Sequence, residues 1–418
     1  MIQTIHRAEY VLADGALLRN AAVTVSETGR ILRAEPQINF RPDAEHKAID
    51  WGAAVILPGL VNAHTHLELT RMHGQVTGTS SFTDWLWQVV QKRRDWTKEE
   101  YLDSARSGAR MALASGTTLV GDVSASGHSG EALASERLRG VIFEEILGFA
   151  PAAADSLVQA LESRIDRFDP RGLLARGVSP HAPYSVSPDL YRGVAGLARR
   201  RTLRTATHLA ETRSEVEFLK AGTGEFPEFL SRLGVMPAGW APPGSGPVEY
   251  MEALNFLEQS PLLIHCNYPD PGSIARILQR RCSVVLCPRS HAYFGHEKHP
   301  VRHLLDSGVN VALGTDSLAS NESLSMLDEI RFLFKTRRDL ASEEIFRMAT
   351  INGAIALRLE GEVGRLRPGA WADMAVIGLP EKTEAKHLLS QMLEGLGECL
   401  ATMVGGEIAW SRSPEPGP

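Results

Sequence analysis

Two histidines separated by one residue end the apolar stretch "LPGLVNAHTHLELT", residues 57–70. In an extended strand, His64 and His66 stand at i and i+2, so both side chains project from the same face. On a buried face, two imidazoles without partners would be costly to remove from water. A metal ion that binds a nitrogen of each ring removes that cost. The spacing therefore predicts half of a metal site.

Further titratable residues follow other apolar stretches of the chain. His181 follows "GLLARGVSP", His208 and Glu211 stand in "THLAET", His265 stands in "LLIHC", and Asp316 stands in "LGTDS". A single strand histidine is more often a buried structural residue, and a single aspartate often caps the next helix. The recurrence of such groups at successive strand ends favours one shared site instead.

Histidine nitrogens together with one carboxylate suit Zn²⁺, and also Fe²⁺. We expect His64, His66, His208 and Asp316 to hold one divalent ion and to leave a position open for water, as catalytic sites do. The ion would lower the pKa of that water toward about 7. Glu211 is then available to take and return a proton.

His265 is expected to hydrogen-bond the attacking oxygen or the charge that develops on the substrate. The predicted catalytic residues are therefore Glu211, His265 and Asp316.

The elements that position these groups are strands that alternate with helices. From residue 57 to about residue 365, apolar β-type runs alternate with amphipathic stretches such as 98–115 and 214–234, which is typical of a parallel sheet. Eight such runs, buried on both faces, predict a closed (β/α)₈ TIM barrel with its active groups at the carboxyl ends of the strands. An open doubly wound α/β sheet is the alternative, but no GxGxxG motif follows the first strand.

Both ends of the chain have short alternating runs separated by turns. Residues 1–56 and 366–418 predict a small composite β-sandwich domain beside a catalytic barrel domain, residues 57–365. The Pro- and Gly-rich segment 234–251 predicts a loop at the barrel mouth, between the fifth and sixth strands. The tail "SPEPGP" is expected to be disordered.

Charge and composition narrow the class of protein. The 418 residues carry a formal charge of -6, and this lack of a basic footprint does not indicate nucleic-acid binding. No apolar run approaches the length of a membrane span, and the first residues lack the apolar core of a signal peptide. The 4 cysteines form no CxxC pair, so we expect free thiols and a cytoplasmic location.

Several motifs resemble those of one enzyme family across nearly the whole chain. "NAHTHLE", "HAPYSVSP", "THLAET", "IHCNY", "LGTDSLASN", "MATINGA" and "GRLRPGAWADMAVI" stand in the order found in the amidohydrolase superfamily. They are most similar to its aminohydrolase branch. That branch includes the S-adenosylhomocysteine and methylthioadenosine deaminases, aminofutalosine deaminase, guanine and cytosine deaminases, and the triazine chlorohydrolases.

The resemblance assigns the same roles as the residue chemistry. It implies that His64, His66, His208 and Asp316 are the metal ligands. It implies further that Glu211 is the general acid and base, that His265 orients the water and that His181 contacts the substrate.

Members with two metals bridge them with a carboxylated lysine at the end of the fourth strand, where this chain has "SPHAPYS". The resemblance therefore implies a mononuclear site, and also a homo-oligomer.

The remaining substrate contacts are expected in the loops. Glu68 directly follows the two histidines, and Trp85 could form a wall for a flat ring; packing of that helix on the barrel is an equal alternative. In "CPRSHAYFGH", His291 stands where the family commonly has Asn, and Arg289 lies nearby. Glu68, Trp85, His181 and His291 are our predicted substrate-binding residues.

Together these features predict a metal-dependent hydrolytic deaminase that releases ammonia from an aminated nitrogen heterocycle. The resemblance favours a 6-aminopurine nucleoside, either aminofutalosine or an adenosine derivative. The alternatives are a triazine-type chlorohydrolase or aminohydrolase, and a guanine, cytosine or pterin deaminase. A non-catalytic scaffold would have gaps among the ligand positions, and none is missing.

Overall fold

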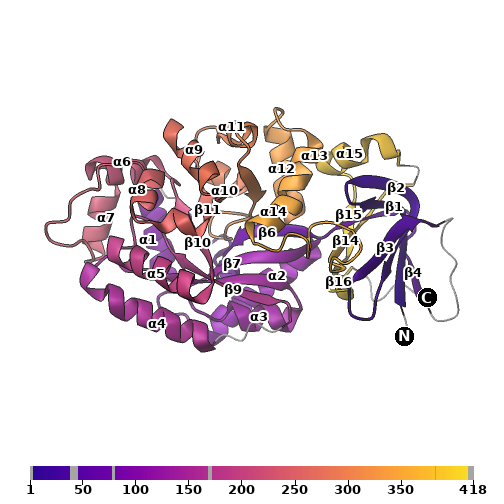
Figure 1. Cartoon of the computed structure of the whole chain (residues 1–418), viewed down its shortest axis with the longest axis horizontal. Coiled ribbons are helices and arrows are strands. Elements are labelled where there is room, and N and C mark those ends of the chain that lie inside the picture. Colours follow the sequence, from indigo (N-terminus) through magenta and orange to yellow (C-terminus); the bar gives the residue numbers. More distant parts are fainter. Residues whose placement is uncertain (1–2, 38–45, 78–80, 168–171, 382, 413–418) are drawn as a thin grey trace.

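Two eight-stranded sheets organise the chain, which we describe from a computed structural model covering residues 3–37, 46–77, 81–167, 172–381 and 383–412. One sheet forms the barrel, and the other forms a small sheet to its right in Figure 1. The tail predicted to be disordered lies outside the described residues. Among those residues, no helix is both long and apolar enough to cross a membrane.

The barrel consists of parallel strands that neighbour one another in chain order. They are β6 (Leu60–Thr65), β7 (Thr117–Ser124), β8 (Arg139–Ile146), β9 (Leu174–Pro180), β10 (Arg204–Leu209), β11 (Leu262–His265), β12 (Ser283–Leu286) and β13 (Asn310–Leu313). The backbone N–H groups of Thr315 and Asp316 donate to the carbonyl of His64 at 3.0 and 3.1 Å. These bonds bring the last strand against the first and confirm the predicted barrel.

The apolar stretch from residue 54 to residue 65 contains two strands of different sheets. Its front half is β5 (Ala54–Pro58), which pairs with β1 and β14 of the small sheet. The chain then crosses at Gly59 into β6, where a Cβ atom would lie 2.1 Å from Thr118 Oγ1. Only glycine allows so close an approach. The predicted domain boundary between residues 56 and 57 therefore falls inside β5.

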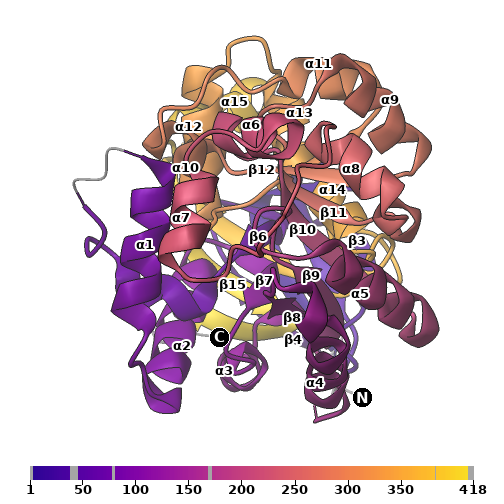
Figure 2. The same ribbon diagram turned by 90° about the vertical axis from the view of Figure 1, so that its left-hand side faces the viewer.

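Helices surround the barrel strands, as the end-on view of Figure 2 shows. They are α1 (Phe82–Arg93), α2 (Lys98–Ala114), α3 (Ser129–Glu136), α4 (Ala154–Arg167), α5 (Pro188–Arg201), α6 (Arg213–Ala221), α7 (Phe226–Arg232), α8 (Pro247–Ala253), α9 (Pro271–Gln279), α10 (Pro288–Tyr293), α11 (Val301–Asp306), α12 (Met326–Thr336), α13 (Ser342–Met348) and α14 (Ile351–Ala356). The last helix, α15 (Leu388–Glu394), lies between two strands of the small sheet in the chain and packs on α12 and α13. Short 3-10 turns join some of them, including η2 (Leu67–Met72) directly after β6.

Local sequence explains where individual helices begin and end. Thr97 and Glu100 form a capping box at the start of α2, which satisfies backbone donors of the first turn. The single helical stretch expected over 214–234 is two helices, because Gly222 ends α6 in a left-handed conformation with φ 70°.

The small sheet is built from both ends of the chain. Its strands are β1 (Gln3–Ala13), β2 (Ala16–Val25), β3 (Ile31–Pro36), β4 (His46–Asp50), β5, β14 (Met374–Gly378), β15 (Glu398–Val404) and β16 (Glu407–Ser411). A buried bidentate pair joins it to the barrel: Arg139 of β8 donates to both oxygens of Asp373 at 2.7 and 2.9 Å. Such paired, charge-assisted bonds fix orientation as well as distance.

The core follows the alternation of the barrel strands. Val141 and Phe143 of β8 pack inside the barrel with Ile264 and Val285, whereas Ile142 packs outward against the helices. The four cysteines are buried and free, as expected.

Candidate active site

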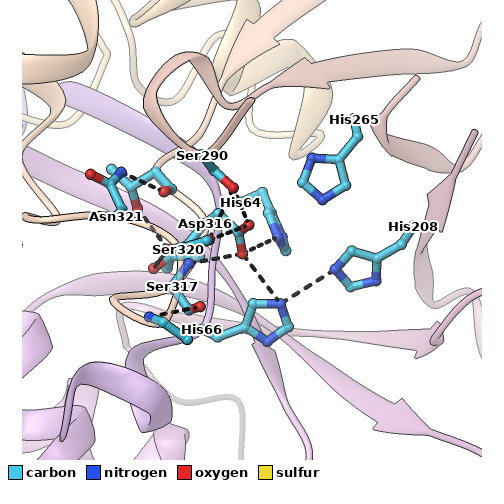
Figure 3. A network of polar contacts seen from close by, with 12 residues as sticks. His64, His66, His208, His265, Ser290, Asp316, Ser317, Ser320 and Asn321 are labelled. Atoms are coloured by element: carbon cyan, nitrogen blue, oxygen red, sulfur yellow. Dashed lines mark hydrogen bonds and ion pairs between the residues drawn. The ribbon is translucent and has the colours of Figure 1, made fainter. Parts of the chain in front are cut away.

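Four side chains from three barrel strand ends converge at one point (Figure 3). His64 lies near the end of β6 with His66 just beyond it, His208 lies near the end of β10, and Asp316 follows β13. His66 Nε2 lies 3.3 Å from His208 Nε2. Asp316 Oδ1 lies 3.5 Å from His64 Nε2 and 3.9 Å from His66 Nε2. The predicted ligand set is therefore brought together.

This donor set fits a divalent metal ion. Zinc binds histidine nitrogens at about 2.0–2.1 Å, so neighbouring ligand atoms in its shell are about 3–3.5 Å apart. Most separations here match that spacing. His64 is buried, and neither of its ring nitrogens has a hydrogen-bond partner among the described residues. A bound ion would satisfy one of these nitrogens, which is otherwise a costly buried polar group.

The protonation states also suit metal binding. Burial lowers the pKa of His66 and His208 well below the ordinary value, so both rings are neutral at pH 7. Burial alone would raise the pKa of Asp316, but the close approach of His64 and the other nearby imidazoles holds it well below its ordinary value. Neutral histidines and one ionised carboxylate are the forms that bind metals.

Surrounding groups hold these ligands in place. Asp316 Oδ2 accepts hydrogen bonds from Ser290 and Ser320 at 2.7 and 3.0 Å, and Oδ1 accepts one from the Ser317 backbone. His208 Nδ1 lies 3.0 Å from the carbonyl of His181, which leaves Nε2 for the ion. The two serines were not predicted; Ser290 lies in the "CPRSH" segment, where a hydroxyl near an aspartate is a weak signal.

Glu211 and His265 form the second part of the site. Glu211 Oε1 lies 3.4 Å from His265 Nε2. Burial, with contributions from Asp316 and Glu215, raises the pKa of Glu211 well above the ordinary value. Burial lowers the pKa of His265 to about 3. A carboxyl group with a raised pKa beside a neutral imidazole is suited to proton transfer near pH 7.

The backbone is unusual at the ends of β11 and β13. His265 has φ 73° and Asp316 has φ 59°, a left-handed conformation that costs free energy for residues other than glycine. In β11 the alternation would direct His265 away from the interior, because Ile264 packs inside. The left-handed turn brings the ring back toward Glu211.

A pocket of about 340 Å³ opens over these groups. Of the predicted substrate residues, His181 and Trp85 line it. Trp85 is fixed by a 2.9 Å hydrogen bond from Nε1 to the carbonyl of Ala319. The rest of the lining is largely apolar and includes Leu69, Phe82, Leu86, Val89, Leu147, Phe149, Tyr184, Phe229, Leu230 and Leu233.

Glu68 and His291 are not among the lining residues. The Glu68 carboxylate accepts hydrogen bonds from the hydroxyls of Ser124 and Ser126 and from backbone N–H groups of the loop after β7. Glu68 therefore ties η2 to that loop. The His291 ring lies 5.4 Å from that of His296, between ring centres.

Arg289 lies outside the pocket lining as well and donates to Ser323 Oγ at 2.8 Å.

Two charged lining residues were not predicted, Arg93 at the end of α1 and Glu145 near the end of β8. A signal was present for Glu145. Glu145 stands two residues after Phe143 and four after Val141, which both point into the barrel, so the alternation of a strand directs its side chain into the barrel as well.

Comparison with known proteins places these observations in a family. The profile of the amidohydrolase family matches residues 55–409. A 5-methylthioadenosine/S-adenosylhomocysteine deaminase of Pelotomaculum thermopropionicum is 30% identical over 393 residues, covering 90% of this chain and 83% of that protein. An aminodeoxyfutalosine deaminase of Deinococcus radiodurans is 31% identical over 356 residues, 82% of each. The crystal structure of a Xanthomonas campestris adenosine deaminase with bound zinc superposes with a TM-score of 0.82 at 26% identity, covering 97% of this chain and 92% of that one.

Proposed function

The chain belongs to the amidohydrolase family, and from this premise we propose that it is a metal-dependent hydrolytic deaminase of a 6-aminopurine nucleoside. Its relatives support this substrate class, since they include deaminases of methylthioadenosine, S-adenosylhomocysteine, aminodeoxyfutalosine and 5′-deoxyadenosine. The reaction exchanges the amino group of the purine ring for oxygen from water and releases ammonia.

The observation that carries the proposal is the contact between two groups with opposite pKa shifts beside the ligand cluster. Glu211 and His265 are 3.4 Å apart, and both line the pocket with His66, His208 and Asp316. This arrangement supports a role for Glu211 as the proton carrier between a ring in the pocket and the ion-binding residues. Deamination needs such a group, because protons move from water to the ring and to the departing amine.

The residues of the site have distinct roles in the proposed reaction. A divalent ion held by His64, His66, His208 and Asp316 supplies the Lewis acidity that lowers the pKa of water. Glu211, ionised, takes a proton from the attacking water and delivers it to the ring nitrogen next to the carbon under attack. It then carries the second proton to the leaving amine, so water enters and ammonia departs in balance.

His265 is neutral and lies against Glu211, where it orients the attacking oxygen. The apolar lining of the pocket excludes bulk water and so strengthens these polar contacts.

We propose Zn²⁺ as the ion, with Fe²⁺ as the alternative. Three nitrogens and one oxygen suit both metals. We keep a homo-oligomer and a cytoplasmic location as predictions. The second is supported by the four buried free thiols, which fit a reducing compartment.

An ammonia-release screen tests the proposal. Purified protein, loaded with zinc, is incubated with adenosine, 5′-deoxyadenosine, methylthioadenosine, S-adenosylhomocysteine, aminodeoxyfutalosine, guanine, cytosine and a chlorinated triazine. We expect ammonia from at least one adenine nucleoside. Release from none of them, or chloride from the triazine alone, would contradict the proposed substrate class.

A further inference from the structure

Two adjacent glutamates near the end of β8 differ in where they point. Glu144 faces out of the barrel, where it lies 3.7 Å from Arg164 of α4. Glu145 faces the interior and lines the pocket. Strand alternation directs the two side chains to opposite faces. Both are glutamates and both are buried, at 3% and 4% exposure, so Glu144 is a matched control for substitutions of Glu145.

The Glu145 carboxylate lacks a hydrogen-bond partner. Its Oε1 is fully buried and has no hydrogen-bond partner among the described residues. Glu144 Oε2 also lacks a hydrogen bond, but it has the ion pair with Arg164, whereas no described side chain forms an ion pair with Glu145. Burying such a group without a partner is costly, and native structures rarely do so without a functional reason. In its ionised form a carboxylate only accepts hydrogen bonds, so the missing partner of that form is a hydrogen-bond donor or a cation.

Glu145 lies on the side of the pocket formed by His181 and His208. A carboxylate oxygen of Glu145 and one ring nitrogen each from His181 and His208 all lie within 4.8 Å of one another. Glu145 is therefore next to the ligand cluster and beside His181, a predicted substrate contact. The missing partner is therefore either a donor group of the substrate or a second metal ion.

A second ion is the weaker explanation. His208 Nδ1 is turned to the His181 carbonyl, and Nε2 lies 3.3 Å from His66 Nε2 within the first ligand cluster. No nitrogen of His208 remains for another ion. His181 Nδ1 lies 2.7 Å from Ser185 Oγ, which leaves one nitrogen of that ring and one carboxylate, too few ligands for a closed site.

Arg93 provides a positive charge in the same pocket. Burial raises the pKa of Glu145 to about 7, and Arg93 is the largest influence that opposes this rise. The cation thus favours the ionised, hydrogen-bond-accepting form of a carboxylate that burial alone would neutralise.

We propose that Glu145 is a substrate-binding residue whose carboxylate accepts a hydrogen bond from a sugar hydroxyl of the nucleoside. This inference rests on the proposed function. In adenosine, 5′-deoxyadenosine and methylthioadenosine the reacting amino group goes to Glu211, so the donors left for Glu145 are the hydroxyls of the sugar. A site built to bind a hydroxyl strongly disfavours the analogue that lacks it.

The test compares Glu145→Gln and Glu145→Ala with wild type and with the control Glu144→Gln. Each zinc-loaded protein is assayed for kcat/KM on the adenine ribonucleosides of the ammonia-release screen and on their 2′-deoxy and 3′-deoxy counterparts. We expect wild type to prefer the ribonucleoside over at least one deoxy counterpart by about 10- to 100-fold. Both Glu145 variants should lose that preference, since they slow the ribonucleoside and leave the deoxy compound unchanged. Glu144→Gln should keep it.

The possible failures are distinct. If wild type deaminates none of the ribonucleosides, the proposed function is wrong and this inference falls with it. If wild type is active but the Glu145 variants lose activity equally on ribo- and deoxynucleosides, Glu145 acts on stability or charge and not on a hydroxyl. If Glu145→Gln lowers the bound metal from two ions per chain to one, Glu145 is a metal ligand.

Discussion

The floor and the wall of the pocket are built in different ways. The floor is formed at or just beyond barrel strand ends by His66, His208, Glu211, His265 and Asp316, which line the pocket, together with the fully buried His64 beside them. The wall consists of Phe82, Trp85, Phe149, Phe229 and Leu230, from α1, α7 and the loop after β8. Floor side chains are fixed by neighbouring polar groups and strained backbone, whereas wall side chains are mostly held by apolar packing.

Because of this difference, we expect substitutions on the floor and on the wall to change different kinetic constants. Replacing a metal ligand or the proton carrier on the floor removes a group that acts only on the reacting atoms, so the substitution should lower kcat. A truncated wall residue removes apolar contact made equally with substrate and transition state, so it should mainly raise KM.

The largest effect is expected for Asp316→Asn on the floor. The change removes the single negative ligand charge and disturbs the hydrogen bonds from Ser290 and Ser320. We expect loss of bound metal and a fall in kcat of at least about 10³-fold. Metal analysis and ammonia release on the same preparation check this. Full metal content with near-normal turnover would remove Asp316 from the ligand set.

Glu211→Gln is expected to have the next largest effect. The amide is similar in shape but cannot shuttle a proton, so kcat should fall by about 10²–10⁴-fold. Metal content should stay at the wild-type level, because Glu211 is not among the ligands. Steady-state kinetics with metal analysis separate this variant from Asp316→Asn. Turnover within a few-fold of wild type would rule out the assigned role.

The pH profile should also report the floor. Glu211 must be ionised to accept a proton, and its pKa is raised well above the ordinary value, which is about 4.3 for glutamate. Activity is therefore complete above that raised pKa and falls as the pH drops through it, by about tenfold per unit. The pKa values of His66 and His208 are lowered, so their protonation comes at lower pH. An acid limb of kcat/KM at or below pH 4.3 would contradict this assignment.

The smallest effect is expected on the wall. Trp85→Ala removes a ring that packs 5.6 Å from Phe82 and 5.0 Å from Phe294, between ring centres. We expect KM to rise by about tenfold with little change in kcat and none in metal content. A drop in kcat as large as that of Glu211→Gln would show that floor and wall are not separable in the way described.

The floor could be predicted from sequence far better than the wall. Histidines and carboxylates at strand ends are rare and chemically distinctive, so His64, His208 and Asp316 could be placed before the fold was known. All eight predicted barrel strands are present, because runs buried on both faces have a clear apolar signature.

The wall could not be predicted in the same way. Phe149 and Phe229 look like any other apolar residues in sequence, and only the loop paths bring them over the floor. Glu68 shows the opposite difficulty. Its position after His66 suggested a substrate contact, but the chain turns at η2 and directs the carboxylate to the loop after β7.

Glu145 lies between these two cases. Its inward direction followed from the alternation of β8, yet nothing in the sequence signalled that its carboxylate would be left unpaired. That fact depends on the packing of several elements around one point. Hydrogen-bond satisfaction is a property of the folded chain, and for that reason it is informative about ligands.

The central claim is that one divalent ion is held by His64, His66, His208 and Asp316. The most direct test is the transition-metal content of the purified wild-type protein, measured per chain alongside ammonia release before and after treatment with a chelator. We expect one ion per chain, loss of activity with its removal, and recovery when zinc is restored. A fully active protein without metal, or two ions per chain at full activity, would contradict the claim.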